Sequence, residues 1–374
     1  MESIVIVLNF GGPRNTDEVQ TFLFEILRDP NTIQLPVPGW LQDVFAHWIA
    51  ARRAPETARQ YGEIGGRSTI VEDTHRIARA LEAALAKSGC RIPVMEAQRY
   101  VPGHTREVVA RIMASADAAH GGQEGKSTPP KSILAVPLYP HFSYASTGSS
   151  LEQLRGELHR AGYTGDLRAL RSYPDDPGYL DAVADRLQAC LDESGLRTGE
   201  TVILCSAHGL PAAYVKNGDP YRLELYRTVE RLAERFAAWR FELSFQSRIG
   251  PRAWLTPYTE HIIPELAAQG AKDVVFLPLS FVSDHIETLY EIDRTYFDLA
   301  RQCGLRPHRM VAIGDHPAHV RTLRDAVLRW HAGRGGVPVE ELLPPDQSHA
   351  RWRRYIWGAG WATLFAALLY ALRG

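Results

Sequence analysis

The chain has 374 residues, of which 45% are hydrophobic, and this size and composition suit a globular protein of two ordinary domains rather than a disordered chain. Its formal net charge of -1 gives no overall field that would attract nucleic acid or an acidic substrate, so charge must act locally. The four cysteines stand apart without a CxxC pair, which indicates neither a disulfide framework nor a thiolate zinc site and favours a reducing cytoplasm.

The first half of the chain begins with a short apolar run. Residues 4–8 predict a buried strand rather than a signal peptide, because no basic region precedes them and a Gly-Gly-Pro turn follows. Residues 121–130, GGQEGKSTPP, predict an exposed loop. After this loop, residues 133–137 predict a second strand and residues 151–160 a helix.

The second half of the chain repeats this alternation. Predicted strands lie at 202–205, 243–246 and 274–279, and predicted helices at 179–191, 221–239 and 257–268. The pattern favours an α/β fold with doubly wound parallel sheets. IVIVLNFGGP at 4–13 and TVILCSAHGLP at 201–211 are each an apolar strand that ends in a small-residue turn and proline, as a duplicated domain would give. We expect domains at 1–150 and 151–332, a linker at 333–350 and a separate element at 351–374.

His208 is the first polar group at a predicted strand end, in the sequence LCSAHGLP. Ligands of open α/β sheets bind beyond the carboxyl ends of the strands. Small neighbours leave the imidazole accessible, and near neutral pH it can accept a proton or coordinate a metal. The alternative is a loop histidine whose ring is satisfied by backbone hydrogen bonds.

An acidic segment follows the predicted strand at 274–279. Its ionisable residues are Asp284, His285, Glu287, Glu291 and Asp293. In an α-helix Glu287 and Glu291 lie one turn apart, and their repulsion is unfavourable unless the pair binds a cation or relays protons. The alternative is a solvated acidic first turn that complements the helix dipole, which explains Asp284 and Glu287 better than it explains Glu291.

Aromatic and basic residues accompany several predicted turns. They occur in RR at 52–53, YGEIGGRS at 61–68, RY at 99–100, YPHFSYASTGSS at 139–150 and FQSRIGPRAWLTP at 245–257. A flat conjugated ligand with carboxylate arms needs aromatic or apolar faces for its ring and Arg, Ser or Tyr donors for its arms. Each segment alone fits ordinary loop chemistry, but the set together favours such a ligand.

These motifs occur in the order found in protoporphyrin ferrochelatases, and residues 4–331 resemble that family. The most specific segments are SAHGLP at 206–211 and LPLSFVSDHIETLYEID at 277–293. The resemblance implies a metal-inserting lyase that places Fe²⁺ in protoporphyrin IX to form protohaem, the terminal step of haem biosynthesis. It also implies two Rossmann-like domains with the porphyrin in the cleft between them, in agreement with the duplication.

The resemblance assigns roles to matching positions. His208 matches the family's active-site histidine and Glu287 the glutamate that faces it; both would be catalytic and would contact the substrate iron. Asp284, His285 and Glu291 would continue a path for metal or protons. Porphyrin contacts would come from Asn9, Phe10, Arg53, Tyr61, Ser68, Arg99, Tyr100, Ser247, Trp254 and Phe281. In the family the acidic segment is a π-helix, which would change the one-turn stacking but keep the carboxylates along one channel.

The expected mechanism follows from what metallation must overcome. Ferrous ion has to shed water, two pyrrole protons have to leave, and a planar ring hides its nitrogen lone pairs. A cleft that clamps and bends the ring exposes those lone pairs at the expense of binding energy from remote contacts. His208 and Glu287 would then divide proton removal and metal delivery, and the sequence leaves that division open.

Three positions separate this chain from parts of the family. No cysteine follows Cys303, whereas animal members carry a C-terminal cysteine cluster for a [2Fe–2S] centre, so we expect no cofactor. Phe10 stands where coproporphyrin-type enzymes carry tyrosine, which favours the substrate with two propionates. Thr69 stands where many members have proline, which leaves the shape of that loop open.

The C-terminal segment predicts a membrane anchor without reference to a family. Residues 355–372 carry no charged side chain, and a helix of this length rises about 27 Å, close to the hydrocarbon thickness of a bilayer. Aromatic residues and Arg351, Arg353 and Arg354 at one end place the catalytic domains on the cytoplasmic side of a bacterial inner membrane. The alternative is a helix that lies in the interface or packs on the globular part.

A second apolar element, residues 35–50, falls where the family has the lip of its cleft. Its hydrophobic stripe would touch lipid and take up protoporphyrin there, or would form part of the core. Membrane lipid and an upstream porphyrin-producing enzyme are therefore the expected partners beside the two substrates.

Two other functions compete with iron insertion. The related chelatases that load cobalt or nickel into more polar tetrapyrroles share the fold but lack the extended lip, and they bind a more acidic macrocycle through more basic residues. A membrane-tethered porphyrin or haem carrier is the other alternative, although a carrier has no use for both His208 and the acidic segment.

Overall fold

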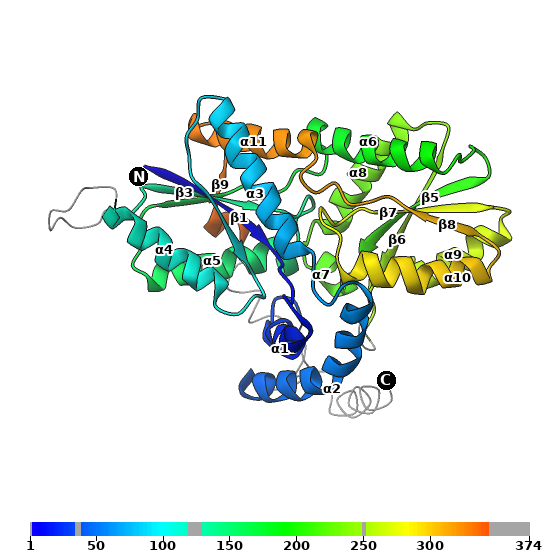
Figure 1. Cartoon of the computed structure of the whole chain (residues 1–374), viewed down its shortest axis with the longest axis horizontal. Helices are drawn as coiled ribbons and strands as arrows, with labels where there is room; N and C mark the ends of the chain where they lie inside the picture. Colours follow the sequence, from blue (N-terminus) through cyan, green and yellow to red (C-terminus); the bar gives the residue numbers. More distant parts are fainter. Residues whose placement is uncertain (1, 34–38, 119–128, 249–251, 344–374) are drawn as a thin grey trace.

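Two parallel β-sheets with helices on both faces make up most of the computed structural model, which describes residues 2–33, 39–118, 129–248 and 252–343 (Figure 1). The first sheet has the strand order β2-β1-β3-β4-β9 and the second the order β6-β5-β7-β8. The strands are β1 Ser3–Asn9, β2 Val94–Gln98, β3 Ser132–Pro137, β4 Asp166–Ala169, β5 Thr201–His208, β6 Arg240–Gln246, β7 Asp273–Pro278, β8 Arg306–Arg309 and β9 Val337–Pro338. Only β9 runs antiparallel to its neighbour, β4.

The two sheets repeat one topology. In each, the first strand along the chain pairs with the second on one side and the third on the other, and the fourth lies beyond the third. β1 and β5, which carry the two similar sequences at 4–13 and 201–211, therefore occupy equivalent places. The predicted α/β fold with parallel sheets is confirmed, and so is the internal duplication.

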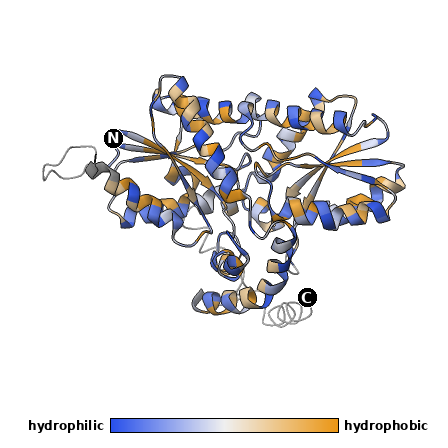
Figure 2. Ribbon diagram, in the orientation of Figure 1, coloured by the Kyte–Doolittle hydropathy of each residue, from blue (hydrophilic) through white to orange (hydrophobic). Residues whose placement is uncertain are grey.

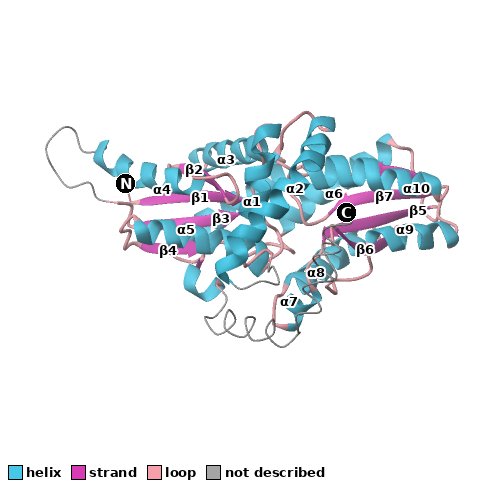
Figure 3. Ribbon diagram, turned by 90° about the horizontal axis from the view of Figure 1, so that it is seen from below, coloured by secondary structure: helices cyan, strands magenta, loops and turns pink. Residues whose placement is uncertain are grey.

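Helices cover both faces of each sheet. The α-helices are α1 Val19–Arg28, α2 Gln42–Glu63, α3 Ile70–Lys87, α4 His104–Ala118, α5 Ser149–Arg160, α6 Pro177–Glu193, α7 Ala212–Lys216, α8 Tyr221–Arg235, α9 Thr259–Ala268, α10 Phe297–Gln302 and α11 Pro317–His331. Two π-helices, η3 Tyr144–Gly148 and η4 Glu287–Tyr296, and three 3₁₀ helices, η1 Thr16–Glu18, η2 Gly39–Leu41 and η5 Val339–Leu342, complete the described elements. Figure 3 shows the sheets side by side, with α1 and α2 near their junction.

One continuous core joins the two sheets. Strand β1 is buried on both faces, as strands of a covered parallel sheet are. Val5 and Val7 share their cluster with Ile203 and Cys205 of β5 and with apolar residues of α6 and α11, so these helices tie the sheets together. Figure 2 shows the apolar residues concentrated in the strands and the hydrophilic ones on the outward helix faces.

The ends of two predicted helices differ from the structure. The helix predicted at 221–239 is α8, which ends at Arg235 because the chain turns before β6 begins at Arg240. The backbone N–H of Trp239 donates to the carbonyl oxygen of Phe236 at 2.8 Å in this turn. The helix predicted from 257 is α9, which begins at Thr259.

The sheets do not follow the predicted division of the chain at every point. Strand β4 lies after residue 150, yet it pairs with β3 in the first sheet. The predicted linker at 333–350 contributes β9 and η5, because Val339 and Leu342 are buried in the core of the first sheet. The chain thus returns to the first sheet after it has completed the second.

The predicted membrane anchor at 351–374 lies outside the described residues, as do residues 34–38 of the second apolar element and most of the loop predicted at 121–130. Among the residues that the structure describes, no helix is both long and apolar enough to span a bilayer.

Candidate active site

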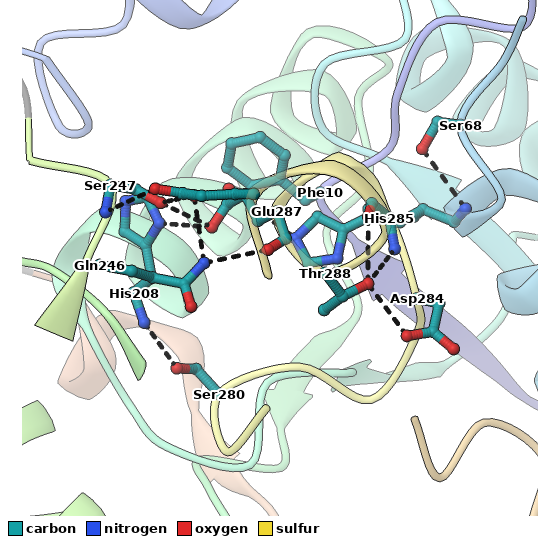
Figure 4. A network of polar contacts seen from close by, with 12 residues as sticks. Phe10, Ser68, His208, Gln246, Ser247, Ser280, Asp284, His285, Glu287 and Thr288 are labelled. Carbon is teal, nitrogen blue, oxygen red and sulfur yellow. Dashed lines mark hydrogen bonds and ion pairs between the residues drawn. The ribbon is translucent and has the colours of Figure 1, made fainter. Parts of the chain in front are cut away.

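The carboxyl ends of three adjacent strands of the second sheet supply the central residues of the site. β5 ends at His208, β6 leads into Ser247, and β7 leads into Ser280 and then to Glu287 at the start of η4. Because parallel strands end at one edge of a sheet, these residues meet there. Figure 4 shows His208, Ser247 and Glu287 turned toward one another.

His208 and Glu287 form an ion pair. His208 Nδ1 lies 2.7 Å from Glu287 Oε2, and the two side chains remain 39% and 25% exposed, so a ligand can reach both. The contact occupies Nδ1, and within the described residues no hydrogen bond to Nε2 is formed. Nε2 is therefore the ring nitrogen that can receive a proton or metal from a ligand.

The backbone of His208 is held by two hydroxyl groups. Its N–H donates to Ser280 Oγ at 3.0 Å, while Tyr221 Oη from α8 donates to the His208 carbonyl oxygen at 3.1 Å. Tyr221 Oη also lies 2.9 Å from Ser280 Oγ, which closes the set of contacts. The imidazole therefore projects from a fixed backbone.

The charges of the pair stabilise each other. Burial lowers the pKa of His208, but the Glu287 carboxylate outweighs this effect and raises the pKa above its ordinary value. Burial acts in the opposite sense on Glu287, yet His208 and His285 hold the pKa of Glu287 well below its usual range. His285 Nε2 lies 3.7 Å from Glu287 Oε1. Both effects favour the charged form of the pair, an imidazolium beside a carboxylate.

Glu291 lies behind this pair in a cage of donors. Its carboxylate accepts hydrogen bonds from Ser247 Oγ, from Ser247 N at 3.1 Å, from Gln246 Nε2 at 3.2 Å and from Tyr296 Oη at 3.1 Å. Burial and the nearby Glu287 carboxylate raise its pKa. Ser247 adopts a left-handed φ of 64°, a strained conformation for a residue other than glycine that its two bonds to Glu291 hold in place.

The acidic segment is a π-helix, as the resemblance implied. A π-helix forms its backbone hydrogen bonds between residues five rather than four positions apart, so its turn is wider than that of the α-helix assumed from the sequence. The two carboxylates still face one group, because Ser247 Oγ lies 3.5 Å from Glu287 Oε2 while it donates to Glu291. Glu287 and Glu291 therefore lie close together, and a channel that joins them to solvent stays a prediction.

The Asp284 carboxylate contacts Arg309 and Thr288 rather than Glu287 or Glu291. Its Oδ1 accepts from Arg309 Nη1 at 2.6 Å and from Thr288 Oγ1 at 2.9 Å, and its backbone carbonyl accepts from Thr69 Oγ1. We predicted a metal or proton path through Asp284, but its carboxylate is occupied by Arg309. His285 by contrast lies next to Glu287, and its place on such a path stays a prediction.

Two predicted ring-contact residues of the second half lie next to the pair. The Phe281 ring centroid is 6.5 Å from that of His208 and 4.3 Å from that of His285. Trp254 forms an isolated antiparallel bridge with Pro211, in the turn that follows His208. Both side chains are partly exposed and can therefore receive an apolar ligand.

Three residues of the first half complete the site. Phe10 follows β1, where its ring packs 4.5 Å from that of Tyr100, and Figure 4 includes it in the same close view as Glu287. Tyr61, at the end of α2, is buried, and burial together with the Glu287 carboxylate raises its pKa. Ser68 is buried in the loop between α2 and α3 and donates its backbone N–H to the carbonyl oxygen of Pro13 at 2.8 Å.

Asn9 and Arg53 lie outside this group. The buried Asn9 side chain donates from Nδ2 to Thr74 Oγ1 at 2.9 Å and accepts from the backbone N–H of Phe10 at 2.8 Å. The amide thus shapes the turn after β1 and joins that turn to α3. Arg53 is exposed on α2.

Arg99 and Tyr100 belong to a buried polar cluster. Arg99 Nη2 and Tyr100 Oη each donate to Asp29 Oδ2 at 2.7 Å, and Arg99 Nε donates to Ser149 Oγ at 2.9 Å. Tyr100 is almost fully buried. We predicted porphyrin contacts for both residues; the structure instead commits them to Asp29, whose buried charge needs these partners.

Four site residues were missed in the sequence analysis, namely Gln246, Ser280, Tyr221 and Arg309. The rule that identified His208, a polar group at the carboxyl end of a strand, applies equally to Gln246 and Ser280 and would have found them. Arg309 ends β8, a short strand that the apolar pattern did not predict. Tyr221 reaches the site from a helix, and no local signal indicates that.

Within the described ranges, no three His, Cys, Asp or Glu side chains are grouped to hold a metal ion. Two surface hollows, of about 590 and 510 Å³, are lined by other residues, the first around His316 and the second around His308.

The chain is similar to known proteins over most of its length. A family model described as Ferrochelatase matches residues 3–330. The ferrochelatase of Geobacter metallireducens is 38% identical over 327 residues, which cover 87% of this chain and 98% of that protein. The ferrochelatase of Thermosynechococcus vestitus is 37% identical over 360 residues, covering 94% and 87%, and that of a Synechococcus species is 39% identical over 343 residues, covering 88% and 94%.

Proposed function

Because the chain belongs to the ferrochelatase family, we propose that His208 and Glu287 act as one unit that removes the pyrrole protons of protoporphyrin and passes ferrous iron to the ring. The chain is a metal-inserting lyase of haem biosynthesis that inserts Fe²⁺ into protoporphyrin. The observation that supports the proposed roles most directly is the 2.7 Å contact between His208 Nδ1 and Glu287 Oε2.

Insertion of Fe²⁺ releases two protons from the ring, and the pair with its neighbours offers a route for them. His208 takes a pyrrole proton at Nε2 when its ring is neutral, and Glu287 stabilises the imidazolium that forms. Ser247 Oγ contacts both Glu287 and Glu291, so its hydroxyl links the two carboxylates. Glu291, with its raised pKa, is the next acceptor, and Tyr296 lies beyond it.

Iron reaches the ring as a substrate and leaves as part of the product. The Glu287 carboxylate and the neighbouring imidazoles of His208 and His285 offer oxygen and nitrogen ligands that replace water one at a time. The same side chains take part in removing the pyrrole protons. The positive charge that arrives with Fe²⁺ is therefore balanced by the positive charge that leaves with the two protons.

The porphyrin would lie against Phe10, Trp254 and Phe281. Contacts along its apolar faces supply binding energy remote from the reacting nitrogens. If the surface formed by these residues is complementary to a bent ring, that energy exposes the nitrogen lone pairs. We assign the propionate groups to Tyr61, Ser68 and Ser247, the hydroxyl donors that the resemblance implied for them.

We also propose that the chain works at the cytoplasmic face of a membrane. The predicted anchor at 351–374 supports this, together with three apolar residues that lie exposed on the segment at the start of α2. Trp40, in η2 just before α2, is 79% exposed, and Val44 and Trp48, one turn apart on α2, are 62% and 41% exposed. A poorly soluble porphyrin and the enzyme that produces it would then share one surface with the site.

The test is a spectrophotometric assay of the purified full-length chain with protoporphyrin IX and Fe²⁺. We expect the free-base porphyrin bands to be replaced by those of haem with repeated turnover. Binding of the porphyrin without turnover would indicate a carrier. Insertion of cobalt or nickel into a more acidic tetrapyrrole, with no activity on protoporphyrin, would indicate the related chelatase.

A further inference from the structure

Arg309 is the one described arginine whose side chain bridges two carboxylates of the acidic segment. Its Nη1 lies 2.6 Å from Asp284 Oδ1 and its Nε 2.6 Å from Asp293 Oδ1. Only 10% of the arginine side chain is exposed. A planar guanidinium in such a place fixes both partners in direction as well as in distance.

The two carboxylates flank Glu287 in the chain. Asp284 precedes the first residue of η4, and Asp293 lies within η4. One guanidinium at the end of β8 therefore anchors the π-helix on both sides of the residue that contacts His208. Because β7, which leads into the π-helix, pairs with β8 as well as with β5, Arg309 and His208 belong to one rigid sheet.

Asp284 is also a junction between the two halves of the chain. Its carboxylate accepts from Arg309 and from Thr288, and its backbone carbonyl accepts from Thr69 Oγ1 in the loop before α3. The same loop carries Ser68, which we expect to contact the porphyrin. A displacement of Asp284 would therefore move the π-helix and the first-half wall of the site together.

We infer that Arg309 is a positioning residue for iron insertion: by pairing with Asp284 and Asp293 it sets the π-helix so that Glu287 meets His208, and Asp284 serves this anchor rather than the iron path. The inference deepens the proposed function and rests on it. A shift of about 1 Å in a reacting group costs on the order of 100-fold in rate, so loss of the anchor acts on turnover. Arg309 touches none of the ring-contact residues, and porphyrin affinity should change little.

The chain offers a matched control in Arg306, at the other end of the same strand. Its Nε and Nη2 lie 2.7 Å from the two carboxylate oxygens of Asp273, so Arg306→Met also removes an arginine–aspartate pair from β8. Asp273 is at the opposite end of the sheet from His208. Arg306→Met should lower Tm and leave kcat near the wild-type value.

The experiment compares kcat, the KM for protoporphyrin and Tm in full-length variants. Arg309→Met should lower kcat by about 10- to 100-fold, with the KM for protoporphyrin within about twofold of wild type. Arg309→Lys keeps the charge but cannot bridge both carboxylates as a fork, so it should recover kcat in part. Arg309→Met leaves the carboxylates of Asp284 and Asp293 without their partner. The charge-free variant Asp284→Asn/Arg309→Met/Asp293→Asn removes the same bridge without leaving an unpaired charge.

The kcat values of these variants show whether Arg309 positions the π-helix. A folded charge-free variant with wild-type kcat, or an equal loss of kcat in Arg306→Met and Arg309→Met, overturns the positioning role. A selective loss of kcat in both Arg309→Met and the charge-free variant, with partial recovery in Arg309→Lys, supports it. Failure of the wild-type chain to insert iron would instead refute the proposed function, and the assay of the unsubstituted protein reveals that first.

Discussion

Single residues decide how the site handles protons, and Glu287 is the clearest case. The Glu287 carboxylate raises the pKa of His208 against the effect of burial. The imidazole accepts a pyrrole proton only when neutral, so kcat/KM should rise with pH as the pH passes this raised pKa. Glu287→Gln removes the charge at nearly constant shape, so the effect of burial is no longer outweighed and the pKa of His208 should fall.

The expected result for Glu287→Gln is a kcat lower by about 100-fold or more, with the acid limb of kcat/KM moved to lower pH. Tm should change far less than turnover. Glu242→Gln, which removes a partly exposed carboxylate paired with Arg240, is the control and should leave the pH profile unchanged. An acid limb at the same pH in Glu287→Gln would remove Glu287 from its role beside His208.

The sequence was enough to predict the central residues of the site, and the wrong predictions have a physical reason. His208 was found because strand ends carry ligand-binding groups, and Glu287 because adjacent carboxylates need a partner. Arg99 and Asp284 were misjudged because a sequence pattern shows which side chains carry charge but not which opposite charge, here Asp29 and Arg309, will neutralise them.

Among the elements, the turn after β5 packs closely against the end of β6 and against Trp254. A Cβ atom on Gly209 would lie 2.7 Å from the Gln246 carbonyl oxygen and 3.1 Å from the Trp254 ring. Gly209→Ala should therefore push β5 and the Trp254 segment apart, with a loss of about 1–3 kcal/mol in stability and a fall in kcat. Gly195→Ala at the end of α6, where no such contact exists, reports the cost of the left-handed φ alone.

The measurement is thermal unfolding together with turnover for both variants. Gly209→Ala should lose activity out of proportion to its loss of Tm, whereas Gly195→Ala should lose only stability. Equal behaviour of the two variants would show that the close approach at Gly209 has no bearing on the site.

Among the elements, the strongly apolar strands were predictable and the π-helices were not. β1, β5 and β7 are buried on both faces, and their continuous apolar runs identify them. The acidic segment has a helical periodicity that residue pattern alone assigns to an α-helix; the wider turn became an expectation only through family resemblance. β8 and β9 are short and partly polar, so no pattern marked them.

For the whole molecule, the duplicated topology followed from two similar strand-and-turn sequences, but the return of the chain to the first sheet did not. Val339 and Leu342 are buried in a segment whose Gly and Pro content is typical of a linker. Composition indicates only that this segment prefers an irregular backbone. It does not show that β4 leaves a free sheet edge with which β9 can pair. The absence of a [2Fe–2S] centre stays a prediction.

Deletion of residues 351–374 tests the membrane proposal. The last described elements, β9 and η5, precede this segment, so the fold and the site should survive the deletion. The truncated chain should leave the membrane fraction, keep its activity on porphyrin in detergent and lose activity on porphyrin supplied in liposomes. Truncated protein that still sediments with membranes would make the exposed residues Trp40, Val44 and Trp48 the anchor, and their replacement by serine checks that result.

The central claim is that the His208–Glu287 pair performs the metallation, and His208→Ala tests it most directly. Porphyrin binding, followed by fluorescence, should persist, because the ring contacts lie on Phe10, Trp254 and Phe281. Haem formation from protoporphyrin IX and Fe²⁺, measured on the same sample in a single turnover, should be abolished. Near-normal haem formation by His208→Ala would contradict the account.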